Sequence, residues 1–274
     1  MALLERQAAT KVTIPSPVPK VSVVMPAYNQ ERYCGEAIES ILAQTFVAFE
    51  CIIVDDGSGD GTSALLEWYA RTDARIHLIR HEVNRGISAS LNGAIGRARC
   101  ELIARMDADD IALPHRLERQ VAFMDQNPGI VAAGSSYRTI GDGGDIIGGI
   151  YAMESDPKHI RLGMAGGPML AHPTVIMRRS LVLKAGGYRS AFDLAEDLDL
   201  WLRLMEIGEL SNILTSCASE STGPAKGIRS PRSRLLPPGF PSRRLSRRAS
   251  HYWLCKKALR MTGASQSQRN LAFY

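Results

Sequence analysis

A chain of 274 residues can bury a sizeable core, as one large domain or as one domain with an appendage. Its composition, 45% hydrophobic and 22% charged residues, is ordinary for a soluble globular protein. No stretch approaches the ~20 apolar residues of a membrane-spanning helix, and residues 1–20 carry charges and proline or serine breakers where a secretory signal would be apolar. These features argue against an integral membrane protein and a secreted one, and we expect a cytoplasmic protein.

The net charge of +5 is unevenly distributed along the chain. Residues 211–274 contain twelve Lys or Arg and one acidic residue, so this segment carries +11 and the first 210 residues carry −6. Five cysteines, an odd number without metal-ligand spacing, give no disulfide framework. Cys34, Cys51 and Cys100 lie in apolar stretches, which favours small core residues and a reducing compartment.

Strands and helices are predicted to alternate after a flexible segment 1–20. The expected strands are Val21–Ala27, Phe49–Val54, Arg75–Arg80, Glu101–Met106, Gly129–Ala133 and Thr174–Arg179, and the expected helices are Glu31–Gln44, Thr62–Arg71, Ser88–Ala98, Pro114–Asn127 and Ala195–Glu209. This alternation predicts a mainly parallel sheet covered by helices on both faces. In such sheets ligands bind at the carboxyl ends of the strands.

The chain changes character after residue 210. Residues 211–250 are rich in Ser, Pro and Arg without a clear period, a composition that cannot order itself by burying apolar surface. We interpret residues 211–274 as an irregular basic tail, either disordered or encoded in a shifted frame, although 251–273 again shows helical spacing. Its charge would attract an anionic membrane surface or nucleic acid, but incidental charge is the simpler alternative. No nucleic-acid-binding fold is recognisable, so we expect no specific nucleic-acid partner.

The strongest chemical signal is the acidic sequence Asp107-Ala108-Asp109-Asp110, which follows an expected strand. Residues two apart on extended backbone point to the same side, so Asp107 and Asp109 can converge on one site. Two carboxylates at that range repel each other, and a hard divalent cation relieves the repulsion while staying open to substrate phosphates. The alternative is a solvated acidic turn in which Asp110 caps the next helix.

Three further polar motifs also follow expected strands. Asp55-Asp56-Gly57-Ser58 ends the second strand, where a carboxylate can accept hydrogen bonds from a base or ribose and glycine allows close approach. The residues Pro26, Ala27, Tyr28 and Asn29 follow the first strand, and Asn84-Arg85-Gly86 would place a cationic donor near phosphates. For each motif the alternative is an ordinary turn or a solvated loop.

Together these motifs, in this order and each at a strand end, resemble glycosyltransferase family 2 over roughly residues 21–210. The resemblance implies an α/β protein with the GT-A fold and an inverting transfer of sugar from a nucleotide-diphosphate donor. It also implies that Asp56, with Asp55 and the 26–29 loop, holds the base and ribose. Asp109, helped by Asp107, would place Mn²⁺ or Mg²⁺ on the diphosphate. Family precedent favours a uridine diphosphate sugar and a glycan or lipid-linked acceptor for envelope or extracellular polysaccharide.

Two later features match the same family. The resemblance puts His172, within Ala171-His172-Pro173-Thr174, at the edge of the donor site, with a purely structural histidine as the alternative. It makes Asp197 the general base, next to Glu196, and this base would take the proton of an acceptor hydroxyl as the nucleoside diphosphate departs. The alternative is that both acids only favour a helix N-terminus through the macrodipole.

Other functions remain open at this point. Family members usually continue with an ordered segment that closes over the donor, and residues 211–250 do not resemble it. The alternative to an active enzyme is therefore a catalytically impaired nucleotide-sugar-binding protein of the same fold. A processive polysaccharide synthase would need transmembrane helices and a Gln-x-x-Arg-Trp motif, and a nucleotidyltransferase would need a glycine-rich phosphate loop after the first strand; the sequence contains none of these. Membrane contact through the basic tail would be peripheral, at the inner face.

Overall fold

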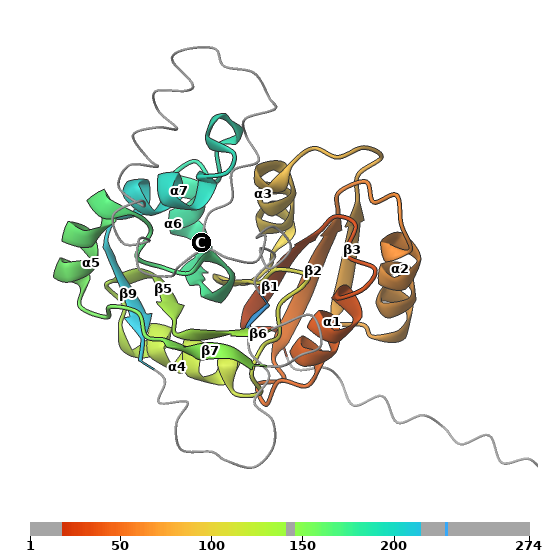
Figure 1. The fold of residues 1–274 in the computed structure, drawn as a ribbon, viewed down its shortest axis with the longest axis horizontal. Helices are drawn as coiled ribbons and strands as arrows, with labels where there is room; N and C mark the ends of the chain where they lie inside the picture. The colour runs from red at the N-terminus through yellow and green to blue at the C-terminus, as the bar shows by residue number, and fades with distance from the viewer. Residues whose placement is uncertain (1–17, 141–145, 215–227, 230–274) are drawn as a thin grey trace, which may run out of the picture.

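The computed structural model describes residues 18–140, 146–214 and 228–229, which form two β-sheets and the helices around them (Figure 1). The large sheet contains β1 (Val21–Ala27), β2 (Phe49–Asp55), β3 (Ile76–Arg80), β4 (Leu102–Arg105), β5 (Ile130–Ser135), β8 (Ile176–Arg178) and β9 (Glu209–Ile213). The small sheet contains β6 (Tyr137–Ile140), β7 (Ile146–Tyr151) and β10 (Ile228–Arg229). The strand orders are β3-β2-β1-β4-β8-β5-β9 and β10-β6-β7.

The large sheet is mixed but mostly parallel, as the sequence predicts. Strands β3, β2, β1 and β4 are parallel neighbours, and β5 is parallel to β9. Strand β8 alone is antiparallel to both of its neighbours, β4 and β5. Because the parallel strands share one direction, the loops that follow β1, β2 and β4 emerge at the same edge of the sheet.

Helices cover both faces of the large sheet (Figure 1). They are α1 (Cys34–Leu42), α2 (Thr62–Thr72), α3 (Ile87–Arg97), α4 (Arg116–Gln126), α5 (Pro157–Gly163), α6 (Arg179–Lys184) and α7 (Glu196–Leu204). Residues of α1, α2 and α4 share one apolar cluster with the sheet, and residues of α3, α5, α6 and α7 share another. Strand β1 alternates between them, with Val23 and Met25 in the first cluster and Val24 in the second.

The three cysteines expected in the core are buried and free. Burial raises the pKa of the Cys34 thiol to about 11 and that of Cys51 to about 12. Neither thiol is therefore ionised near neutral pH, and the prediction of small core residues is confirmed for Cys34, Cys51 and Cys100.

The predicted helix Ala195–Glu209 is wrong at its C-terminal end. Helix α7 ends at Leu204, and β9 begins at Glu209 and runs to Ile213, across the predicted domain boundary at residue 210. The turn between them passes close to β5: a Cβ on Gly208 would lie 2.4 Å from Val131 Cγ1. Glycine therefore allows the chain to leave the helix and pair with the sheet edge. Residues 215–227 and 230–274 of the tail lie outside the described residues.

Sequence analysis missed the elements between β5 and β8. The N-terminus of α5 carried a readable signal, because Asp156 precedes Pro157 and its carboxylate accepts hydrogen bonds from the Lys158 and His159 N–H groups. The predicted strand Thr174–Arg179 is shorter than expected, since Thr174 belongs to a 3₁₀ turn, η2 (His172–Thr174).

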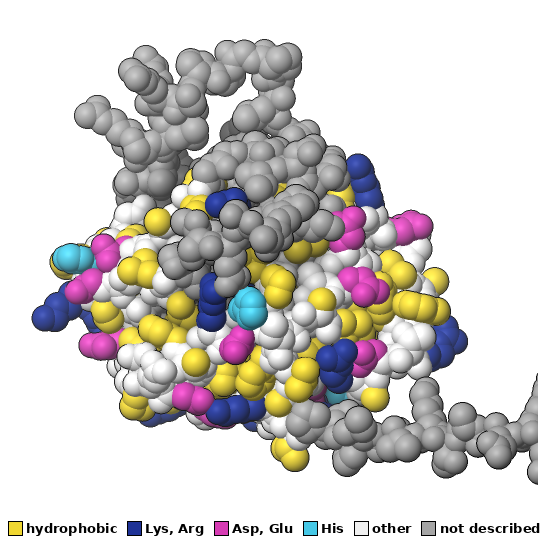
Figure 2. Space-filling view, turned by 90° about the horizontal axis from the view of Figure 1, so that it is seen from below, with side chains coloured by type: hydrophobic (Ala, Val, Ile, Leu, Met, Phe, Trp, Pro, Cys, Tyr) yellow, Lys and Arg dark blue, Asp and Glu magenta, His cyan; other side chains and the backbone are white. Residues whose placement is uncertain are grey.

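One face of the described residues is mixed in charge. Figure 2 shows acidic and basic side chains interspersed with apolar ones on one face, without a large area of a single charge. Within the described ranges, no helix combines the length and the apolar character needed to cross a bilayer.

Candidate active site

The loops after β1 and β2 are joined directly to each other. The Asp56 N–H donates to the Ala27 carbonyl oxygen at 2.9 Å, and the Gly59 N–H donates to Asn29 Oδ1 at 2.9 Å. The Asn29 N–H in turn donates to Ser58 Oγ at 3.1 Å, while Asn29 holds a positive φ of 53°. The structure thus brings together two of the predicted nucleotide-binding motifs, with Tyr28 partly exposed beside them.

The two carboxylates of the β2 motif have different partners. Asp55 is buried and accepts hydrogen bonds from the Ser58 N–H at 3.0 Å and from the Ser63 hydroxyl, so it shapes its own turn. Asp56 accepts hydrogen bonds at 2.9 Å from the backbone N–H groups of both Arg85 and Gly86. Asp56 therefore joins the 84–86 loop to the loop that follows β2.

A histidine completes the surroundings of Asp56. His81 Nδ1 lies 2.6 Å from Asp56 Oδ1. Burial by itself raises the pKa of Asp56, but hydrogen bonds from His81 and from the Arg85 and Gly86 N–H groups outweigh burial and lower it. Asp56 is consequently ionised at neutral pH, and part of its acceptor capacity is used within the protein.

Glycine is required at the point where these loops touch. Gly57 has a φ of 73°, and a Cβ there would lie 2.6 Å from the carbonyl carbon of Val83 and 2.8 Å from the Asn84 nitrogen. Neither backbone atom can move without displacing the 84–86 loop. The close approach that glycine permits in Asp-Asp-Gly-Ser thus serves a contact between loops.

We expect Asp56→Asn to loosen the 84–86 loop. An amide keeps one acceptor oxygen, so at least one of the charge-assisted bonds is lost, at a cost of about 1.5–3 kcal/mol. Hydrogen exchange of the Arg85 and Gly86 amides should become about tenfold faster or more. Asp60→Asn, which alters the neighbouring turn at Thr62, is the matched control. Unchanged exchange at residues 85 and 86 in Asp56→Asn would show that the carboxylate does not hold the loop.

Residues 107–110, which follow β4 and form the acid turn, include one partner of an ion pair that was not predicted from the sequence. Arg105 Nη1 lies 2.7 Å from Asp107 Oδ2, and Arg105 Nη2 lies 2.5 Å from Asp107 Oδ1. The Arg105 side chain is 2% exposed and that of Asp107 is 23% exposed. A charged residue inside the apolar run Leu102–Met106 was the available signal, because buried arginine is rare unless it is paired.

The other two acids of the turn are buried. Asp109 is 8% exposed and Asp110 is 2% exposed. Neither carboxylate oxygen of Asp110 has a hydrogen-bond partner among the described residues. Burial, followed by the charges of Asp107 and Asp109, raises the pKa of Asp110 well above its usual value, while Arg105 and Arg116 oppose this.

This acid-rich turn fits a divalent cation of the Mg²⁺ or Mn²⁺ type. The described residues contain no group of three or more His, Cys, Asp or Glu arranged to hold a metal. Such cations usually bind through one or two carboxylates together with substrate phosphates and waters, not in an all-protein cage. The buried Asp109 and the unpartnered Asp110 carboxylate, in the same turn, fit an open site of this kind.

His172 is packed among aromatic side chains. Its Nε2 lies 2.8 Å from Tyr188 Oη. Its ring packs edge to face against the Trp201 ring, with 5.7 Å between the ring centroids. Burial, followed by the charge of Arg105, lowers the pKa of His172 well below its usual value, so the ring is neutral. This environment suits the structural alternative as well as a position behind the donor site.

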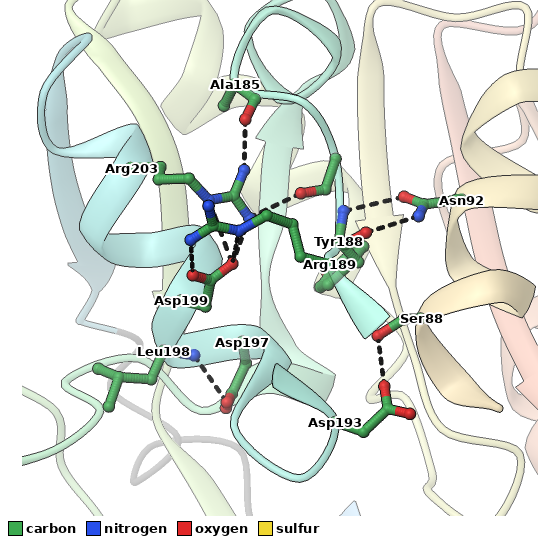
Figure 3. A network of polar contacts seen from close by, with 11 residues as sticks. Ser88, Asn92, Ala185, Tyr188, Arg189, Asp193, Asp197, Leu198, Asp199 and Arg203 are labelled. Carbon is green, nitrogen blue, oxygen red and sulfur yellow. Dashed lines mark hydrogen bonds and ion pairs between the residues drawn. The ribbon is translucent and has the colours of Figure 1, made fainter. Parts of the chain in front are cut away.

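The three acids of α7 have distinct surroundings, and Figure 3 shows those of Asp197 and Asp199. Asp199 is enclosed by Arg189 and Arg203, with Arg189 Nε 3.0 Å and Arg203 Nη2 2.7 Å from its Oδ2. Glu196 is 8% exposed, and burial raises its pKa. Asp197 is more exposed than either and accepts a hydrogen bond from the Leu198 N–H at 2.7 Å. Of the three, Asp197 is therefore the carboxylate best placed to meet a substrate.

One hydrogen bond joins the segment before α7 to the strand-end motifs. Ser88 Oγ, on the first turn of α3, donates to Asp193 Oδ1 at 2.9 Å, joining the loop before α7 to the helix that follows the 84–86 loop (Figure 3). Arg105 also acts electrostatically on this region, because its charge lowers the pKa of Tyr188 and of Glu196, although burial dominates both and raises them.

Comparison with known proteins gives a consistent result. The family model described as Glycosyl transferase family 2 matches residues 22–185. The putative glycosyltransferase EpsE of Bacillus subtilis is 40% identical over 193 residues, which cover 69% of this chain and 68% of EpsE. The O-antigen biosynthesis glycosyltransferase WbnJ of Escherichia coli is 34% identical over 204 residues, covering 73% of this chain and 76% of WbnJ.

Solved structures show the same architecture. S. aureus TarS 1–349 has a TM-score of 0.61 at 23% identity, covering 77% of this chain and 60% of that one, and it has also been solved with UDP-GlcNAc. The mannosyltransferase PcManGT from Pyrobaculum calidifontis, solved with GDP-Man and Mn²⁺, has a TM-score of 0.56 at 21% identity, covering 73% and 56%. At such identities the likeness concerns the GT-A fold alone.

Proposed function

The chain, a member of glycosyltransferase family 2, is a nucleotide-sugar glycosyltransferase (EC 2.4) of polysaccharide biosynthesis, and we propose that it transfers a sugar from a uridine diphosphate donor. The transfer proceeds with inversion and with the help of a divalent cation. The acceptor is a hydroxyl of a glycan or of a lipid-linked saccharide. The observation that carries the proposal is the meeting of the 26–29, 55–58 and 84–86 loops at the sheet edge where β4, the parallel neighbour of β1, leads into the acid turn. Ser88 of α3 is joined there to the segment before α7. TarS and PcManGT, which share the fold, bind UDP-GlcNAc and GDP-Man with Mn²⁺ respectively.

The donor nucleotide is assigned to the joined loops. The base and ribose lie against the 26–29 loop and Asp56, whose remaining acceptor capacity faces the nucleotide. Arg85 and Gly86, held by Asp56 at the start of α3, lie near the diphosphate, where a helix N-terminus favours negative charge. Asp109, with Asp107 beside it, would hold Mn²⁺ or Mg²⁺, and that cation would neutralise charge developing on the leaving diphosphate.

The protein's own carboxylate performs the proton transfer. The acceptor oxygen attacks the anomeric carbon, the bond from that carbon to the diphosphate oxygen breaks, and Asp197 takes the acceptor's proton. Glu196, buried beside it, positions the start of α7. His172 supports the wall formed by Tyr188 and Trp201 and keeps it neutral and apolar, which helps to exclude water from the site.

The proposal is tested by calorimetric titration of the full chain with UDP, with and without Mn²⁺. We expect Mn²⁺ to strengthen UDP binding and Asp109→Ala to abolish that gain, a change of about 10–100-fold in Kd, because Asp109 supplies the cation's protein ligand. Asp125→Ala, which removes an acid on α4 that is 50% exposed, is the charge-matched control and should behave as the unaltered protein.

Three outcomes would contradict the proposal. If UDP bound equally well with and without Mn²⁺, the divalent cation would have no part in the proposed function. No binding of UDP by the folded protein would remove the uridine donor, and titration with guanosine and thymidine diphosphates would then show whether another nucleotide takes its place. Binding without turnover of any donor would favour the catalytically impaired alternative.

A further inference from the structure

We propose that Arg105 is a positioning residue that controls how the acid turn binds its cation. By pairing with both oxygens of Asp107, Arg105 keeps that carboxylate from serving as a full cation ligand and leaves ligation to Asp109 and to the donor's phosphates. This inference rests on the proposed function, because it concerns the same cation.

The geometry of the ion pair supports this role. Each of the two terminal nitrogens of Arg105 contacts a different oxygen of Asp107, at 2.7 and 2.5 Å, a forked arrangement that fixes the carboxylate plane. Arg105 is the last residue of β4, in the interior of the large sheet, and its N–H donates to the Val175 carbonyl oxygen at 2.8 Å. With its side chain 2% exposed, the guanidinium cannot swing into solvent to release Asp107.

The chemistry of the pair opposes cation binding at Asp107. A guanidinium and a divalent cation seek the same carboxylate oxygens, and the fixed positive charge of Arg105 repels a cation placed within a few ångströms of it. The number of charged ligands is a main determinant of affinity at such sites. With only one carboxylate available, the turn binds the cation weakly in the absence of nucleotide. It binds the cation strongly only when a diphosphate supplies further oxygen ligands.

The charge of Arg105 also reaches beyond the acid turn. It acts on Asp107 and Asp110 in the acid turn and on Glu196 and Tyr188. The buried guanidinium therefore offsets part of the repulsion among these acids when no divalent cation is bound.

The test measures Mn²⁺ affinity of the full chain without nucleotide, from the electron paramagnetic resonance signal of free Mn²⁺. Arg105→Met removes the charge and keeps the volume, so we expect Mn²⁺ binding at least about tenfold tighter, as Asp107 becomes a ligand. The double variant Arg105→Met with Asp107→Asn should lose this gain. Arg119→Met, at an exposed position of α4, matches the change in net charge and should leave the affinity unaltered.

A merely structural role for Arg105 would move the affinity in the other direction. A folded Arg105→Met protein with unchanged or weaker Mn²⁺ binding overturns the inference, as does the absence of Mn²⁺ binding in every variant. Where circular dichroism shows Arg105→Met unfolded, Arg105→Lys decides, since a lysine contacts a single oxygen and should tighten Mn²⁺ binding severalfold. The UDP titration is a separate measurement, so the proposed function can stand while this inference fails.

Discussion

Replacing Asp197 with asparagine is expected to lower kcat by about 10²–10⁴-fold while leaving the fold and UDP affinity intact. The reason lies in the surroundings of α7, where Glu196 is buried and Asp199 is engaged by two arginines. An asparagine side chain keeps the shape and the hydrogen bond from the Leu198 N–H but cannot accept a proton. The measurement is turnover of the donor with its acceptor, alongside Kd for UDP with Mn²⁺.

Asp199→Asn is the comparison that separates chemistry from structure. Burial raises the pKa of Asp199, but hydrogen bonds from Arg189 and Arg203 outweigh it and lower that pKa. Arg203 Nη2 also reaches the Gly187 carbonyl oxygen at 2.7 Å, so the cluster ties the 185–189 loop to α7. We expect Asp199→Asn to reduce thermal stability, whereas Asp197→Asn does not. Near-full turnover in a folded Asp197→Asn protein would show that another group is the base.

Replacing Glu50 with glutamine is expected to lower the free energy of unfolding by about 2 kcal/mol. Glu50 is 2% exposed at the start of β2 and accepts hydrogen bonds from Ser22 Oγ at 2.6 Å, the Arg99 N–H at 2.8 Å and Arg99 Nε at 2.7 Å. An amide cannot accept all three, so at least one donor is left unpaired. The melting temperature should fall by about 4–8 °C, measured by circular dichroism.

The effect of Glu50 should depend on pH. Burial by itself raises the pKa of Glu50, but hydrogen bonds from Ser22 and Arg99 outweigh it and hold the pKa below its usual value. The stabilisation is therefore complete above the unfolded-state pKa of about 4.3 and is lost as the pH falls through the lower folded-state pKa. The difference between Glu50→Gln and the unaltered protein should be constant from about pH 6 to 8 and shrink below about pH 4.

Glu118→Gln is the matched control for this measurement. The Glu118 carboxylate is 57% exposed and its neighbours lie at the surface, so its loss should change the free energy of unfolding by less than about 0.5 kcal/mol. A Glu50→Gln difference that persists unchanged in acid would mean that the charge of Glu50 contributes nothing, and that the loss comes from packing.

The sequence by itself determined the order of the elements from β1 to β5 and the edge at which the predicted motifs gather. Short β-branched runs predict buried strands such as β1 and β2, and the helices between them require the strands to be parallel. The loops that follow then meet at the carboxyl edge, so the 26–29, 55–58 and 84–86 motifs could be grouped before any coordinates. The roles of Asp197, Asp109 and His172 stay predictions.

Only the tertiary structure decided which partners these residues have. Asp56 pairs with His81 and the 84–86 loop because strand register and crossover geometry set distances that no local pattern records. Arg105 and Asp107 are only two residues apart, and what the tertiary structure decided there is the burial of the pair. The same holds for β8, inserted antiparallel between β4 and β5, and for β9, where Gly208 ends a predicted helix beside Val131. Periodicity reports which side of a segment is buried, whereas the neighbour it is buried against depends on contacts between residues far apart in the chain.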